Sequence, residues 1–255
     1  MFARFNFKLH DDQFSEKYKT DGYEQLKRMK GTVRQSLNKY LLQDGSLDAT
    51  AIEEDWFPEI KANVFLSHSH ADEKAVISFA SYLYQEYGIT SFIDSIVWGY
   101  ADDLLNQIDE KYCVLAKDAN GNNTYIYEKR NRTTSHVHLL LQGALAKMID
   151  RCECLIFVNT PNSIKMTDVQ NETNTASPWI YSEMLMASTF PARPLKEYRL
   201  DELIHSKSGV TYKINFNGFV DLYMQDFEKA KKNTVIKTPE KILERLYIDK
   251  EILRQ

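Results

Sequence analysis

Val64-Phe65-Leu66-Ser67-His68-Ser69-His70-Ala71-Asp72 begins as a strand-like apolar run and ends in polar residues. Two histidines two positions apart on an extended backbone point to the same side, where they could share a metal ion. The same polar turn after a buried parallel strand could instead line a ligand crevice. This stretch therefore predicts a strand that ends at a functional site, and it leaves two chemistries open.

The overall composition is typical of a globular protein. The chain has 255 residues, of which 43% are hydrophobic, and this is enough for a substantial core. With a formal net charge of -4 we expect no nucleic-acid partner, and the lysine-rich stretch 229–232 is interpreted as a solvated face. No apolar stretch is long enough to cross a bilayer, so no membrane partner is expected. Cys113, Cys152 and Cys154 suggest no disulfide framework, which favours a cytoplasmic protein.

Residues 1–60 are predicted to form an N-terminal extension that precedes a domain over residues 61–255. Apolar residues alternate with polar ones over 3–10, which predicts a strand. Apolar residues at helical spacing then predict a helix over 22–43 and a shorter one over 48–57. The extension is therefore expected to consist of a strand and helices.

From residue 61 onward, apolar runs alternate with amphipathic helices, which indicates parallel β-α-β construction. The pattern predicts strands over 64–66, 89–93 and 155–158, and helices over 72–87 and 135–150. We therefore expect an α/β fold with a mostly parallel sheet of about five strands that is flanked by helices.

The remaining segments are predicted from shorter patterns. Between the second and third strands we expect a short helix over 103–109 and a hairpin around Asn120-Gly121. Near the end of the chain we expect strands over 196–200 and 212–216, and a last helix that is capped by Thr238-Pro239.

Polar residues follow three of the predicted strands: His68, Asp94 and Thr160. The carboxyl ends of parallel strands lie along one edge of a sheet, and ligands of open α/β sheets bind in the crevice there. The sequence therefore predicts that these three residues are neighbours.

A helix is predicted to start at Ser177-Pro178, because serine suits the N-cap and proline the first helical position. Trp179 and Glu183 are then four residues apart on one face of its first two turns. Helix amino termini in such folds lie at the edge where the strands end. Both side chains are therefore expected to enter the crevice.

With these segments in place, the chain resembles the Toll/interleukin-1 receptor (TIR) domain family, particularly the bacterial TIR proteins of anti-phage defence such as those of Thoeris systems. The resemblance covers about residues 61–190, and it implies a three-layer flavodoxin-like TIR fold. Three segments carry it: Val64-Phe65-Leu66-Ser67-His68, Phe92-Ile93-Asp94-Ser95-Ile96-Val97-Trp98 and Ser177-Pro178-Trp179-Ile180-Tyr181-Ser182-Glu183.

Enzymes of this family cleave the nicotinamide-ribose bond of NAD and release nicotinamide with ADP-ribose or a cyclised isomer. The resemblance implies that Glu183 is the catalytic residue of an NAD+ glycohydrolase or cyclase, with NAD as substrate and no other cofactor or metal. A fixed carboxylate can stabilise the oxocarbenium character of the ribose. The expected substrate-binding residues are Ser67, His68, Asp94, Trp98, Thr160 and Trp179.

The resemblance also implies partners and a role. TIR enzymes commonly become active on self-association, and the loop after the second strand helps to complete a neighbouring site. We therefore expect self-association through the TIR domain, an effector or sensor protein as a further partner, and a role in anti-phage immune signalling.

A metal-dependent hydrolase is one alternative. His68-x-His70-x-Asp72 resembles the metal box of metallo-β-lactamase-like hydrolases, and further ligands would be His136, His138 and His205. However, Glu73 stands where that box has another histidine. A helix would also turn His136 and His138 to different sides.

A TIR adaptor without activity is the other alternative. In this interpretation the domain associates with other TIR domains and has no activity, and Glu183 in its Trp-x-x-x-Glu setting argues against it. A separate structural interpretation of the helix makes Trp179 a core aromatic and Glu183 a solvated acid. The spacing alone favours that interpretation, and the matching strand-end segments favour the functional one.

Overall fold

A computed structural model describes residues 1–9, 14–15, 17–22, 37–57, 60–118, 121–167, 172–175, 177–195, 198 and 220–253. Internal contacts divide the chain into two units. The first, here called the sheet unit, consists of Met1–Leu26, Ile60–Asp94 and Met148–Gln255, and the second, the helical unit, of Lys27–Glu59 and Ser95–Lys147. These units differ from the expected division at residue 60.

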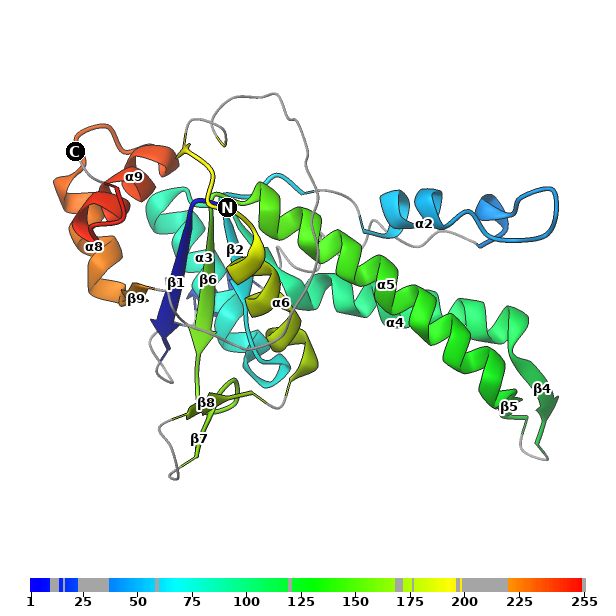
Figure 1. The fold of residues 1–255 in the computed structure, drawn as a ribbon. Coiled ribbons are helices and arrows are strands. Elements are labelled where there is room, and N and C mark those ends of the chain that lie inside the picture. Colours follow the sequence, from blue (N-terminus) through cyan, green and yellow to red (C-terminus); the bar gives the residue numbers. More distant parts are fainter. Residues whose placement is uncertain are drawn as a thin grey trace. The chain divides into compact units, whose positions relative to one another are not determined.

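The sheet unit contains five parallel strands in the order β3-β2-β6-β1-β9. Figure 1 shows β1, β6 and β2 side by side. The mostly parallel sheet predicted from the alternating pattern is therefore confirmed. The strands are β1 (Ala3–Lys8), β2 (Val64–Ser67), β3 (Ser91–Ile93), β6 (Cys154–Asn159) and β9 (Val220–Leu222).

The first strand lies inside the sheet and is not an appendage. β1 pairs in parallel with β6 on one side and with β9 on the other. Its inward residues Phe5 and Phe7 are completely buried. The alternation over 3–10 correctly predicts a strand, but a pattern within one segment cannot show which strands become its neighbours.

Helices cover both faces of the sheet, which gives three layers. Phe7 of β1 stacks on Phe79 of α3 with 4.4 Å between ring centroids, and Phe5 lies against Tyr247 of α9 at 6.1 Å. On the opposite face, Arg4 Nη2 donates to the carbonyl of Phe190, next to the end of α6, at 2.9 Å. These helices are α3 (Glu73–Tyr87), α6 (Pro178–Thr189) and α9 (Pro239–Asp249). The arrangement is consistent with a flavodoxin-like fold.

The ends of these helices follow the sequence signals closely. α3 stops at Gly88, which adopts the left-handed conformation with a φ of 68°. α9 starts after Thr238, whose side chain accepts a hydrogen bond from the backbone N–H of Lys241. The sheet unit also contains η2 (His70–Asp72), α8 (Met224–Asn233) and the antiparallel pair β7 (Lys165–Thr167) and β8 (Glu172–Asn174).

The helical unit contains α4 and α5, which are joined by a hairpin. Its elements are η1 (Leu37–Tyr40), α2 (Ala49–Trp56), α4 (Asp94–Tyr112), β4 (Val114–Lys117), β5 (Asn123–Tyr125) and α5 (Tyr127–Arg151), where Asp94 and the last turn of α5 belong to the sheet unit. Lys147 of α5 forms an ion pair with Glu53 of α2 at 2.7 Å. The predicted helix over 48–57 and the predicted hairpin are therefore both present.

The segment after β3 differs from the expectation. We expected a loop here and a short helix over 103–109, but α4 starts directly at Asp94 and runs for 19 residues. Val97, Ala101, Leu104 and Ile108 are buried at helical spacing, and an acidic side chain in the first turn favours a helix. The TIR resemblance implies a loop after this strand, but in this chain a helix follows β3 directly.

Three predicted elements lie wholly or largely outside the described residues. These are the helix over 22–43 and the strands over 196–200 and 212–216. In the described part of the chain, no helix is both long and apolar enough to cross a membrane.

We expect Phe7→Ala to lower the free energy of unfolding by about 3 to 5 kcal/mol, since it removes a completely buried ring between the sheet and α3. Lys8→Ala is the matched control, because the neighbouring Lys8 is exposed on the same strand and its loss should cost less than about 0.5 kcal/mol. Urea unfolding followed by circular dichroism measures both changes. Equal stability of the two variants would contradict the interior position of β1.

Candidate active site

Ser67 and Glu183 form the centre of a buried polar cluster at the carboxyl edge of the sheet. Ser67 is the last residue of β2, and its Oγ donates to Glu183 Oε2 at 2.6 Å. Both residues are 0% exposed. A strand end and a helix that are 116 positions apart in the sequence are therefore joined by one short hydrogen bond.

The start of α6 places Glu183 in this cluster. Ser177 is the N-cap and accepts from the backbone N–H of Ile180 at 3.3 Å, and Pro178 occupies the first turn. Both features were predicted from the sequence. Glu183 follows on the second turn, on the side of the helix that is buried.

His68 and Asp94 are the second pair of this cluster. In the parallel pairing of β2 with β3, Leu66 lies opposite Ile93, so the residues that follow the two strands come together. His68 Nδ1 lies 2.6 Å from Asp94 Oδ1. The two residues are 4% and 2% exposed. The predicted proximity of His68 and Asp94 is therefore confirmed.

The surroundings of the cluster change the proton affinity of two groups. Burial raises the pKa of the Glu183 carboxyl well above its ordinary value of 4.5, and the charge of Asp94 raises it further, against the opposing hydrogen bond from Ser67. For His68, burial by itself would lower the pKa, but the Asp94 carboxylate, together with a hydrogen bond to the backbone of Leu66, outweighs this effect and raises the pKa above 6.5. The cluster therefore favours protons on both Glu183 and His68.

One buried atom of the cluster has bonding capacity left. Glu183 Oε1 makes no hydrogen bond of good geometry to any residue that the structure describes. The Asp94 carboxyl is nevertheless close enough to act on the Glu183 proton. Buried polar atoms of this kind are costly unless a ligand or water completes their bonding. Perturbed carboxyls beside unsatisfied polar atoms are typical of functional sites.

Thr160 forms a neighbouring polar cluster with Asp72. Thr160 Oγ1 donates to one oxygen of Asp72, and Asn162 Nδ2 donates to the other at 2.7 Å. The expected third neighbour of His68 and Asp94 is therefore bonded to Asp72, which precedes α3. Sequence reasoning missed Asn162 and Ser163, although the run of short polar residues after β6 was a signal for such a turn.

The two tryptophans predicted to bind substrate lie on different helices. Trp179 is in the first turn of α6 and is half-buried. Trp98 is on α4 in the helical unit, where it is also half-buried. Substrate binding by these two tryptophans stays a prediction.

The arrangement of the histidines corrects one expectation. β2 ends at Ser67, and a 3-10 helix starts at His70. As a result His68 is buried and His70 is exposed, so the two side chains do not lie together on one side. His136 and His138 are exposed on α5, and His205 lies outside the described residues. Within the described ranges, no group of three or more His, Cys, Asp or Glu side chains is placed to hold a metal ion.

Comparisons with protein-family models, with curated proteins and with solved structures find no match for this chain.

We expect Glu183→Gln to be more stable than the wild type at neutral pH. The folded chain raises the pKa of Glu183, so the folded state binds more protons than the unfolded state at pH values above 4.5. The free energy of unfolding of the wild type should therefore fall as the pH rises above that value. Glutamine keeps an acceptor for Ser67 and never ionises.

Urea unfolding at a series of pH values tests this expectation. The difference between the two proteins should shrink as the pH is lowered toward 4.5, the ordinary pKa of a glutamate. Glu244→Gln is the control, because Glu244 lies in a surface ion pair with Lys241. A wild type that becomes more stable than Glu183→Gln as the pH rises would contradict the direction of the shift.

Proposed function

We propose that this chain is a TIR-type enzyme that cleaves the nicotinamide-ribose bond of NAD, with Glu183 as the catalytic residue. The observation that carries the proposal is the convergence of Ser67, His68, Asp94 and Glu183 in one buried cluster at the strand ends. Three of these residues come from the strand-end segments of the resemblance, and the fourth comes from its Trp-x-x-x-Glu helix.

The chemistry suits a single fixed carboxylate. When the bond between the ribose C1′ and the nicotinamide nitrogen breaks, its electron pair goes to the cationic ring, which leaves as neutral nicotinamide. No strong general acid is therefore needed. The ribose is left with oxocarbenium character, and a carboxylate held against it lowers the energy of that state. Attack by water gives ADP-ribose and a proton, and attack by another part of the nucleotide gives a cyclised product.

Each member of the cluster has a distinct role in this proposal. Glu183 would carry the negative charge, and the Ser67 hydroxyl holds its Oε2 in place. His68 Nε2 would donate to a ribose hydroxyl or phosphate oxygen, with its ring oriented by Asp94 at Nδ1. Substrate binding would also favour ionisation of Glu183, because the positive nicotinamide ring lowers the pKa of a nearby carboxyl.

One observation favours the alternative of an interaction module without activity. Glu183 is completely buried and bonded to Ser67, as a structural acid would be. In either case we propose a cytoplasmic protein, since Cys113, Cys152 and Cys154 are free and buried. Self-association, an effector or sensor partner, and a role in anti-phage signalling remain proposals that rest on the resemblance.

Incubation of the purified chain with NAD tests the proposal. We expect release of nicotinamide, and we expect Glu183→Gln to reduce the rate by roughly a hundredfold or more, the scale of losing one electrostatic contact to the transition state. The Glu244→Gln variant should keep the wild-type rate. Mass spectrometry of the second product identifies ADP-ribose, a cyclised isomer or another nucleotide.

The adaptor alternative predicts a different result. Wild-type protein, tested also under molecular crowding that promotes self-association, would then release no more nicotinamide than Glu183→Gln. That outcome would overturn the proposed activity.

A further inference from the structure

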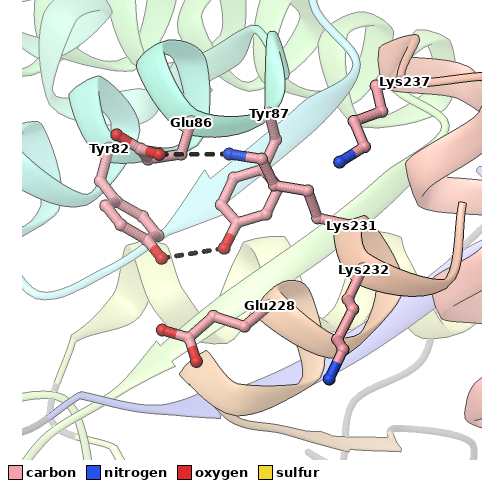
Figure 2. A pocket seen from close by; sticks show the side chains of 7 residues that line it. All are labelled: Tyr82, Glu86, Tyr87, Glu228, Lys231, Lys232 and Lys237. Carbon is pink, nitrogen blue, oxygen red and sulfur yellow. Dashed lines mark hydrogen bonds and ion pairs between the residues drawn. The ribbon is translucent and has the colours of Figure 1, made fainter.

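A pocket of about 350 Å³ lies on the sheet unit, away from the strand-end cluster. It is formed by the C-terminal half of α3, by α8 and by the segment between α8 and α9, as Figure 2 shows. Its size is within the range of small-molecule sites. The lining side chains are Tyr82, Glu86, Tyr87, Glu228, Lys231, Lys232 and Lys237.

One wall of the pocket is held by a network of contacts. Tyr82 and Tyr87 share a hydrogen bond between their hydroxyls at 2.8 Å. Lys231 Nζ lies 3.2 Å from Glu86 Oε2 and 5.0 Å from the centre of the Tyr87 ring. Tyr18 donates to the other oxygen of Glu86 at 2.8 Å. This wall is therefore built before any ligand arrives.

The charges that remain favour an anion. Glu86 is occupied by Tyr18 and Lys231, so its charge is compensated within the wall. Lys232 and Lys237 have no hydrogen-bond or ion-pair partner in the described part of the chain. Figure 2 shows their ammonium groups on opposite sides of the Lys231 side chain. Two separated positive groups suit a ligand that carries two negative groups.

The tyrosine pair adds a donor. In a pair of hydroxyls, one donates to the other, and the proton of the accepting hydroxyl is left for a ligand. Lysine ammonium groups bind phosphate oxygens as point charges. Glu228 also lines the pocket. Its exposed carboxylate repels an anion, unless that ligand also carries a hydroxyl group that donates a hydrogen bond to the carboxylate.

We propose that this pocket binds a ligand that carries two phosphate groups, with Lys232 and Lys237 as the two charged contacts and the Tyr82–Tyr87 pair as a hydroxyl donor. The inference does not depend on the proposed function. Two sources supply such a pair of phosphates, a free diphosphate ester and a lipid headgroup with two phosphates. Val235 and Ile236, next to Lys237, are 96% and 64% exposed and would contact acyl chains in the second case.

Titration of the full chain with inorganic pyrophosphate, followed by isothermal calorimetry, tests the site. We expect saturable binding that weakens about tenfold or more in the double variant Lys232→Gln/Lys237→Gln, because charge-assisted hydrogen bonds are lost. Lys229→Gln is the matched control, since Lys229 is exposed on the same helix but does not line the pocket, and it should bind like the wild type. Glu228→Gln should bind more tightly, because a repulsive charge is removed.

A second arm identifies the source of the phosphates. The chain is mixed with phosphatidylcholine vesicles that contain or lack cardiolipin, and sedimentation is measured. Cardiolipin-dependent binding that is lost in Lys232→Gln/Lys237→Gln and in Val235→Ser/Ile236→Ser assigns the site to a lipid headgroup. Binding of pyrophosphate alone assigns it to a free ester. Failure to bind both probes, or equal weakening by Lys229→Gln, would overturn the proposal.

Discussion

A carboxyl group with no exposed surface stays in a protein interior only when neighbouring groups compensate for its lost hydration. Glu183 has such a group, and Ser67 at the end of the interior strand β2 supplies the compensating hydrogen bond. This bond ties α6 to the carboxyl edge of the sheet. The parallel register of β2 with β3 then brings His68 beside Asp94 at the same edge. One buried acid thus connects the helix layer, the sheet and a charged pair.

The same burial links the structure to the proposed chemistry. It favours the protonated form of Glu183, and Asp94 adds to this effect. A carboxylate that stabilises a ribosyl cation must first lose that proton. The cationic nicotinamide of NAD would promote this loss, so the substrate would create the charge that its own cleavage requires. A structural acid would show no such response to the substrate.

Local patterns predicted the elements that build the site. The apolar run 64–66 and the Ser177-Pro178 signal give strand and helix ends that the structure confirms. The position of β1 between β6 and β9 depends on hydrogen bonds between distant segments, which no single pattern contains. The length of α4 was missed because its polar residues and Gly99 hid the buried spacing of Val97, Ala101 and Leu104. The hydrogen bond from Ser67 to Glu183 could not be predicted from a pattern either, because it joins a strand and a helix that were predicted from separate segments of the sequence.

Glu183 is a buried acid whose proton is held by its surroundings. Carbon-13 NMR of the side-chain carboxyls, recorded across a pH series, measures this proton directly. We predict a titration midpoint for Glu183 well above 4.5 and a lower midpoint in Asp94→Asn, because the neighbouring negative charge is removed. A midpoint at or below 4.5, or one that Asp94→Asn leaves unchanged, would contradict this account of the site.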